Sequence, residues 1–301
     1  MGASSRIKDA GRLARRFTVT KGRQFRLAEV DPDDTGGIDS KEHAAALLAE
    51  GVDRLQLEQE KLYAQGTWAM LLIFQAMDAA GKDSTIKHVM SGVNPQGCQV
   101  FSFKAPSAED LAHDFLWRTT RCLPERGRIG IFNRSYYEEV LVVRVHPKLL
   151  AAQRLPAPVV SKRVWKERFD DINAFERHLM RSGVVVCKFF LHVSKERQKE
   201  RFLERLEKPE KNWKFSAADV VERKQWNDYM AAYEDMIRHT ATPDAPWHVV
   251  PADHKWFTRL VVAATVAEAM SKLDLKFPTV DRAKRRELEA VRAALKRERD
   301  V

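Results

Sequence analysis

The chain has 301 residues, 44% of them hydrophobic, and a formal net charge of +10. This length and apolar content suit one large α/β domain or two small ones, and the charge favours a polyanionic partner (nucleic acid, membrane surface or polyphosphate) without choosing among them. Three scattered cysteines without disulfide or zinc spacing, no apolar run that could span a membrane, and no signal-peptide pattern lead us to expect a cytoplasmic protein.

The first part of the chain is predicted to be a basic arm followed by alternating helices and strands. Residues 1–38 carry few bulky apolar side chains, so we expect an extended arm that closes in the turn at 31–37. A long helix over 40–64, with Asp39 as its cap, precedes an apolar strand at 69–75. The elements expected next are a helix through Ile86 and Val89, a strand at 98–103, a helix from the capping box at 107–110 to about Cys122, and a strand at 128–132.

The same alternation continues in the second half. Apolar residues at helical spacing predict a helix over 161–182, and the nearly continuous apolar run at 184–191 is typical of a buried parallel strand. The elements expected after it are a helix capped by Ser194, a charged break at 207–215, a helix capped by Ser216, a strand at 247–250 and a helix over 256–273. We therefore predict a parallel five-stranded sheet flanked by helices, with ligands at the carboxyl ends of its strands.

A phosphate-binding loop is predicted directly after the first strand, over residues 76–83. Backbone N–H groups of a small-residue turn and the N-terminus of the following helix point at one spot, where Lys82 adds a positive charge. The loop departs from the usual pattern G-x-x-x-x-G-K-[ST], because Ala76 replaces the first glycine and Asp83 the Ser or Thr. Asp78 is an acid inside the cradle and is either a metal ligand or a general base. The alternative is an ordinary strand-to-helix turn with a solvated Asp and Lys.

A second polar cluster follows the strand at 128–132. Asn133 occupies the position at which a Walker B acid would face magnesium, so an anionic metal ligand must come from Asp78 or Glu138. Arg134 and Arg144 are bidentate phosphate donors in this interpretation. The alternative is a polar loop whose arginines pair with its own glutamates.

A third basic segment lies at about 196–222, where phosphotransferases place a mobile lid that stabilises the transferring phosphoryl group. Its arginines are spaced by four residues, so they share one helix face, and lysines follow on the charged break. A surface helix of ordinary salt bridges is the alternative, since glutamates run alongside. His254 and Trp256 follow the last strand and are expected to line the site. The cations concerned are Arg197, Arg201, Arg205, Lys208, Lys211 and Lys214.

Together these segments resemble the second polyphosphate kinase family, the polyphosphate:nucleotide phosphotransferases. The match extends from Asp31 to about Leu273 and is carried by six ordered stretches: 75–83, 92–95, 132–138, 188–192, 212–215 and 245–247. The resemblance implies a thymidylate-kinase-like P-loop fold with a helical lid, acting as a homo-oligomer (dimer or tetramer). It implies Mg²⁺- or Mn²⁺-dependent transfer between inorganic polyphosphate and AMP or ADP, with guanine nucleotides as the second choice.

The resemblance also assigns roles to residues. Asp78 and Lys82 fall on Walker A positions, Arg134 in the Walker B region and Glu138 on a following acid; these four are the expected catalytic residues, and Asp78 and Glu138 the expected metal ligands. Many family members have Asp where this chain has Asn133. The expected phosphate- and nucleotide-binding residues are Ala79, Ala80, Gly81, Asp83, Ser84, Asn133, Arg144, Arg197, Arg201, Arg205, Lys208, Lys211 and Lys214.

The expected organisation is a basic arm (1–38), a kinase domain (39–275) with the lid at about 196–222, and a charged tail (276–301) that is helical without packing. Two other functions compete. An ATP-dependent nucleoside monophosphate kinase would share the fold and the loop. A basic nucleic-acid-binding module would explain the charge, but it leaves the Asp-bearing loop unexplained, and no nucleic-acid motif is present.

Overall fold

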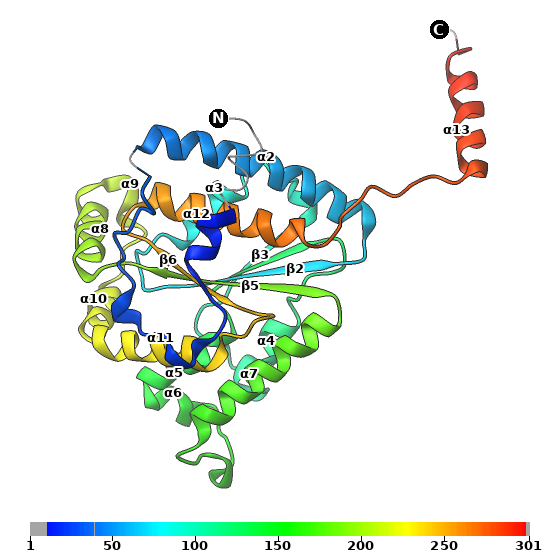
Figure 1. Cartoon of the computed structure of the whole chain (residues 1–301). Coiled ribbons are helices and arrows are strands. Elements are labelled where there is room, and N and C mark those ends of the chain that lie inside the picture. The colour runs from blue at the N-terminus through cyan, green and yellow to red at the C-terminus, as the bar shows by residue number, and fades with distance from the viewer. Residues whose placement is uncertain (1–10, 39, 299–301) are drawn as a thin grey trace.

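The computed structural model describes residues 11–38 and 40–298, and its centre is a six-stranded sheet in the order β1-β6-β5-β2-β4-β3 (Figure 1). Strands β2 to β6 pair in parallel, whereas β1 pairs with β6 in antiparallel fashion. The strands are β1 (Thr18–Val19), β2 (Ala69–Gln75), β3 (Cys98–Ser102), β4 (Ile129–Asn133), β5 (Val184–His192) and β6 (Trp247–Pro251).

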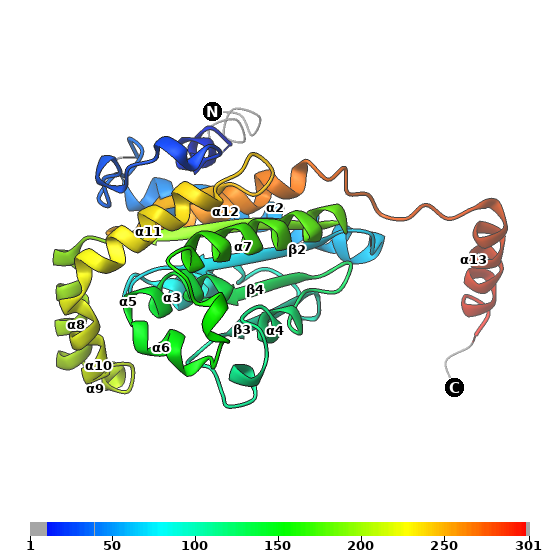
Figure 2. The same cartoon turned by 90° about the horizontal axis from the view of Figure 1, so that it is seen from below.

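Helices cover both faces of the sheet (Figures 1 and 2). One face carries α2 (Lys41–Gln65), α3 (Lys82–Val89) and α12 (Lys255–Ser271). The other carries α4 (Trp117–Thr120), α5 (Val142–Val145), α6 (Pro147–Ala152), α7 (Val164–Arg181) and α11 (Trp226–Thr240). Short 3₁₀ turns lie at Gly22–Gln24, Leu27–Glu29, Pro95–Gly97, Asp110–Ala112, Tyr136–Val140 and Ala157–Val159.

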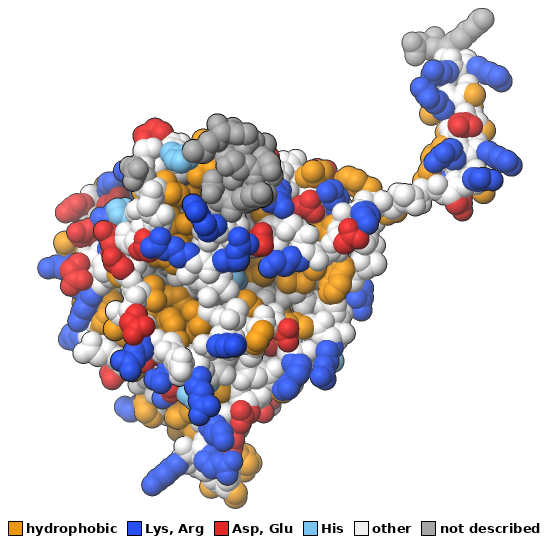
Figure 3. Space-filling view, in the orientation of Figure 1, with side chains coloured by type: hydrophobic (Ala, Val, Ile, Leu, Met, Phe, Trp, Pro, Cys, Tyr) orange, Lys and Arg blue, Asp and Glu red, His pale blue; other side chains and the backbone are white. Residues whose placement is uncertain are grey.

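Two helical parts lie outside these layers. The helices α8 (Lys195–Glu207), α9 (Pro209–Asn212) and α10 (Ala217–Lys224) form a group at one end of the sheet, where the lid is expected (Figure 2). The tail helix α13 (Arg282–Leu295) stands away from the domain, has no buried residue and is dense in lysine and arginine (Figure 3). None of the helices in the described part of the chain has the length and hydropathy to cross a bilayer.

The central strand β2 is buried along its whole length because it has neighbours on both sides. Leu72 pairs with Ile131 of β4 and with Cys187 of β5, which aligns the carboxyl ends of these three strands. Phe74 stacks on Phe189 with ring centroids 5.0 Å apart. The chain segments that leave β2 and β4 are thereby brought together at one edge of the sheet.

A buried ion pair ties the segment after β4 to this core. The Lys188 ammonium on β5 lies 2.6 Å from the Glu176 carboxylate on α7, and both side chains are almost completely buried. The hydroxyls of Tyr136 and Tyr137 donate to the same carboxylate at 2.9 and 2.7 Å. Such a network is stable only when its polar atoms have partners, so it fixes the 3₁₀ turn relative to α7 and β5.

The five predicted strands form the expected parallel sheet, to which β1 adds a sixth, antiparallel edge strand. The expected extended arm is wrong for residues 11–38. Part of this segment is the edge strand β1, and the segment buries Ala14, Phe17 and Leu27. Phe17 packs edge-to-face on Phe257 of α12 at 5.7 Å. A two-residue strand has too little apolar periodicity to be recognised in the sequence.

Two helix starts also differ from expectation. Ser40 caps α2 by accepting the His43 N–H, while the expected cap, Asp39, lies outside the described residues. The capping box at 107–110 forms, with reciprocal bonds between Ser107 and Asp110, but no long helix follows. The 3₁₀ turn Asp110–Ala112 ends at His113, and the Asp114 side chain then accepts the Leu116 N–H and starts a new turn. One helix was expected between Ser216 and the strand at 247, but there are two, α10 and α11, with Gln225 between them. The other predicted boundaries agree within a few residues.

The β1–β6 pairing creates a pH-dependent contribution to stability at His248. Its Nδ1 lies 3.0 Å from Thr18 Oγ1, and burial, followed by Lys272 and Lys188, lowers the pKa of His248 to about 3. Because this pKa is below the ordinary 6.5, the unfolded chain takes up a proton that the folded chain does not. The stabilisation is therefore complete above pH 6.5 and is lost as the pH falls toward 3.

We expect His248→Gln to reduce the loss of stability on acidification. Between pH 7.5 and 5.5, protonation of one unfolded-state histidine costs about 1.4 kcal/mol. Urea unfolding of wild type and variant at these two pH values measures the free energy of unfolding. Its decrease between pH 7.5 and 5.5 should be smaller in the variant by about 1.4 kcal/mol. Equal losses in the two proteins would contradict the role assigned to His248.

Candidate active site

The loop between β2 and α3 has the backbone of an anion-binding turn. Ala79 and Gly81 adopt left-handed conformations, with φ of 60° and 111°. A Cβ at Gly81 would meet nothing closer than 4.0 Å. Glycine is therefore favoured here by its positive φ and not because another group packs against its Cα. Helix α3 begins at Lys82 without a side-chain cap, which leaves its first N–H groups available to an anion.

Lys82 lies beneath this loop. It is buried, and its Nζ donates to the Ala76 carbonyl at 2.9 Å. Burial, reinforced by Arg134 and opposed by Asp78, lowers the pKa of Lys82 to about 8. The ammonium is therefore charged at neutral pH but poorly solvated, which favours its pairing with a bound anion.

Arg134 joins the two segments that leave the sheet. Its Nη2 lies 2.8 Å from Asp78 Oδ1 and its Nη1 lies 3.5 Å from Glu138 Oε2. Glu138, and to a lesser extent Asp78, raises the pKa of Arg134 well above its usual range. Arg134 also has a φ of 66°, a strained value for a non-glycine residue. The structure thus brings together the four expected catalytic residues, including Lys82.

Asn133 contacts the loop in a way that an aspartate could not. Its side-chain amide donates to Asp83 Oδ1 at 2.6 Å, and Asp83 occupies the Ser or Thr position of the usual loop. A carboxylate at position 133 would repel Asp83, whereas the amide orients it. Sequence analysis expected both residues at the site but did not predict this pairing.

The donor groups suit a magnesium ion. The carboxylates of Asp78 and Glu138 converge on a single guanidinium, so both can face one cation. Mg²⁺ prefers oxygen ligands and takes only one or two carboxylates, with water and substrate phosphates completing its shell. Within the described residues no group of three or more His, Cys, Asp or Glu could hold a metal, so a closed protein cage is not formed there.

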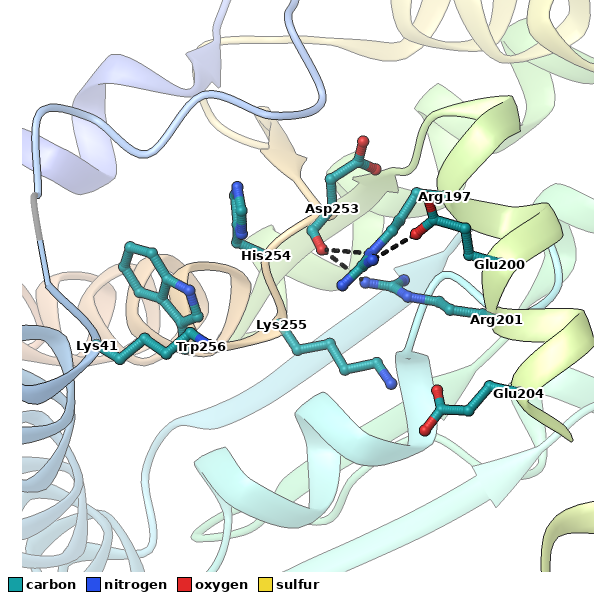
Figure 4. A pocket seen from close by; sticks show the side chains of 9 residues that line it. All are labelled: Lys41, Arg197, Glu200, Arg201, Glu204, Asp253, His254, Lys255 and Trp256. Carbon is teal, nitrogen blue, oxygen red and sulfur yellow. Dashed lines mark hydrogen bonds and ion pairs between the residues drawn. The ribbon is translucent and has the colours of Figure 1, made fainter. Parts of the chain in front are cut away.

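Two cavities lie near this cluster. The first, of about 390 Å³, opens between α8 and the start of α12 (Figure 4). His254 and Trp256 line it as expected, and Lys255 and Lys41 add cations that sequence analysis missed. The position of Lys255, after the carboxyl end of a predicted strand, could have indicated it. Its lining residues are Lys41, Arg197, Glu200, Arg201, Glu204, Asp253, His254, Lys255 and Trp256.

The second cavity, of about 330 Å³, is more apolar and was not predicted. It lies between residues 103–118 and 134–153, and Phe103 and Phe115 contribute aromatic rings. Arg134 and Glu138 also line it, so the catalytic cluster borders this cavity. Its walls come from segments without regular periodicity, which explains why the sequence gave no signal.

Comparison with known proteins identifies the family. The model for polyphosphate kinase 2 (PPK2) matches residues 38–278. The chain belongs to this family. Its resemblance to the family, and its assignment as a phosphotransferase, are therefore confirmed.

Relatives of this kinase align over most of their length. It is 53% identical over 284 residues to the ADP-polyphosphate phosphotransferase of Rhodopseudomonas palustris, covering 91% of this chain and 98% of that protein. It is 42% identical over 265 residues to the AMP/ADP-polyphosphate phosphotransferase of Meiothermus ruber, covering 88% and 95%. The crystal structure of polyphosphate kinase 2 from Arthrobacter aurescens TC1 superposes with a TM-score of 0.84 at 41% identity, covering 92% and 96%.

The lid cations of the kinase have partners within the described chain. The Glu204 carboxylate accepts from Lys208 and Lys211 at 2.8 and 2.7 Å, and these bonds lower the pKa of Glu204 to about 2. The Lys214 ammonium lies 4.9 Å from the Trp213 ring. In this conformation the lid has the salt bridges of the alternative interpretation, and a phosphate chain would have to compete for its cations.

The arginines are also paired, but in different ways. Arg205 lies 3.6 Å from Asp219, and Arg197 pairs with Glu200. Arg144 is bonded to Asp235 of α11 at 2.6 Å, so it braces two helices. Arg201 is buried and bonds to backbone carbonyls, which differs from the exposed phosphate contact that the sequence suggested.

Ser84, an expected phosphate- or nucleotide-binding residue, has a side-chain partner that was not predicted. Its hydroxyl accepts from Arg259 of α12 at 2.8 Å. This bond links the first turn of α3 to α12 and places a further cation beside the loop. Arg259 was not predicted, because nothing in the sequence of α12 distinguishes it from other helix-surface arginines.

We expect Lys82→Met to lower kcat by about 100-fold or more while the protein stays folded. Methionine keeps the buried stem and removes only the charge, and loss of one preorganised charge at a developing anion costs roughly this much. Steady-state kinetics and thermal unfolding measure the two effects. Lys87→Met, on the exposed side of the same helix, is the control. Wild-type turnover in a folded Lys82→Met protein would exclude a role for Lys82 in stabilising a phosphate at the loop.

Proposed function

We propose that this kinase transfers a phosphoryl group between inorganic polyphosphate and adenine nucleotides, converting AMP to ADP and ADP to ATP. The observation that carries the proposal is the position of one catalytic cluster, Asp78, Lys82, Arg134 and Glu138, with a cationic cavity and an apolar cavity nearby. Phosphoryl transfer needs positioning and positive charge more than covalent chemistry. This arrangement supplies both.

The cationic cavity suits the polyphosphate donor. A phosphate chain carries about one negative charge per unit and has no apolar part, so it requires cations along its path. Lys255 is partly buried there, and burial, with the nearby Arg201, lowers its pKa to about 8. A bound phosphate would stabilise the positive charge of Lys255, which burial disfavours.

The apolar cavity suits the nucleoside of the acceptor. Phe103 and Phe115 contribute apolar surface to its wall, with an arginine already over each ring (Arg118 and Arg168), while Arg134 at the border can reach the acceptor phosphate. Relatives named for ADP, and for AMP and ADP together, support adenine nucleotides in this role. Guanine nucleotides remain the second choice.

Asp78 and Glu138 are the residues that would hold Mg²⁺, which supplies charge neutralisation between neighbouring phosphate oxygens. Until the ion and substrates bind, Arg134 neutralises these two carboxylates. Lys82 and the amides of the loop orient the transferring phosphate. The lid cations would leave their glutamate partners, bind phosphates instead and so exclude water from the site. The proposal includes a homo-oligomer in the cytoplasm, as the family resemblance implies.

The donor is tested with long-chain polyphosphate, Mg²⁺ and AMP, by chromatography of the nucleotides. We expect ADP first and ATP later. The matched reaction replaces polyphosphate with ATP. Nucleotide products that form only with ATP would exclude polyphosphate as the donor and indicate a monophosphate kinase. A product that forms from ADP but not from AMP would exclude only the AMP step.

We expect Asp78→Asn to lower kcat by about 100-fold and to raise the Mg²⁺ requirement at least tenfold, because one of the two expected metal-binding carboxylates loses its charge. Asn133→Ala should be milder, since it frees Asp83 without removing a carboxylate. The rate as a function of Mg²⁺ concentration compares the two variants. A wild-type Mg²⁺ dependence in Asp78→Asn would contradict the role of Asp78 as a ligand and favour a general base.

A further inference from the structure

The carbonyl oxygens of the phosphate-binding loop are all occupied. The Lys82 ammonium donates to the Ala76 carbonyl, and the Ala80 N–H donates to that of Met77. The next three carbonyls accept from side chains of the lid helix α8. Gln198 donates to Asp78 O at 2.9 Å, and Arg201 donates to Ala79 O at 3.0 Å and Ala80 O at 2.8 Å.

The direction of these carbonyls determines the direction of the amides. In a planar trans peptide, the C=O of one residue and the N–H of the next point to opposite sides. Carbonyls of Asp78 and Ala80 that face α8 therefore turn the N–H groups of Ala79 and Gly81 away from α8. A loop without such donors could rotate these peptide units, since left-handed and extended backbone are both open to a glycine.

The two donors are themselves fixed. The Gln198 amide has one orientation, because its Oε1 accepts from Arg223 of α10 at 2.9 Å. The Arg201 guanidinium is held on its other side by the carbonyls of Ala252 and Asp253, at 2.7 and 3.0 Å. Figure 4 shows Arg201 extending from α8 toward the segment after β6, beside Arg197. Both side chains are almost fully buried.

We infer that Gln198 and Arg201 are positioning residues, which hold the peptide units of the loop so that its amides face the transferring phosphate. Arg201 acts through the loop backbone and not as a phosphate contact. Through Arg223, the same bonds link the lid helix α10 to the loop, so lid position and amide direction are coupled. The inference deepens the proposed function and rests on it for the identity of the phosphate.

Two charge-conserving variants test this. Gln198→Met keeps the volume and removes the donor. Arg201→Lys keeps the positive charge, but a single ammonium cannot serve four carbonyls as a planar guanidinium does. The exposed Lys199→Arg on the same helix is the control. The probe is tripolyphosphate, titrated calorimetrically into the free protein at two salt concentrations, together with kcat for polyphosphate and AMP.

We expect each variant to bind tripolyphosphate about tenfold more weakly, as the loss of one charge-assisted or buried hydrogen bond implies. The salt dependence of binding should stay that of wild type, because no charge is lost, and kcat should fall at least as much as affinity. Near wild-type binding and turnover in Arg201→Lys, with Gln198→Met unaffected, would overturn the inference and make Arg201 a direct charge contact.

Three outcomes separate the possible failures. Thermal unfolding identifies a misfolded Arg201→Lys protein, in which case Gln198→Met alone decides. If the wild type binds tripolyphosphate but transfers nothing from polyphosphate, the proposed function is wrong while the binding comparison still tests the positioning role. If the wild type does not bind tripolyphosphate, both are wrong.

Discussion

A loop can direct its amides at a phosphate only if its carbonyls have donors elsewhere. In this kinase three of those carbonyls have donors from outside the loop, the side chains of Gln198 and Arg201 on α8, and Lys82 donates to a fourth. The solution has a cost, since Arg201 must be desolvated, and burial lowers its pKa to about 10. Four carbonyl acceptors offset the lost hydration of the two Nη groups, whereas the buried Nε has no hydrogen-bond partner in the described part of the chain; the guanidinium remains charged at neutral pH.

Charge balance around Arg134 is the second condition. Two carboxylates close to each other repel, and Arg134 neutralises both. Its left-handed backbone needs support from the surrounding structure. The buried pair of Lys188 and Glu176 provides it, because the two tyrosines that follow Arg134 are bonded to that carboxylate. A buried ion pair adds little net stability, but it fixes one arrangement.

Much of this could be predicted from the sequence, and the limits have physical reasons. The β2 and β5 strands and the loop between β2 and α3 were recognisable because buried parallel strands are continuous apolar runs and phosphate loops have characteristic residues. The edge strand β1 was not recognisable, since two residues are too few to show a hydrophobic periodicity. Lys188 was read as part of an apolar strand, and only the tertiary structure shows the carboxylate beside it.

The arginines of α8 show more clearly what could not be predicted from the sequence. Spacing by four residues correctly predicted that Arg197, Arg201 and Arg205 share a helix face. It cannot distinguish an arginine that is available to bind substrate from one that is hydrogen-bonded to backbone carbonyls. The structure distinguishes them by burial: Arg201 is 5% exposed, whereas the Arg197 side chain is 46% exposed and contacts the neighbouring Glu200 and the Asp253 carbonyl. An exposed pair of this kind is weak and exchanges readily for phosphate. Under the proposed function, the same helix holds the loop with one arginine and offers another to the phosphate chain, which would couple lid closure to the alignment of the amides.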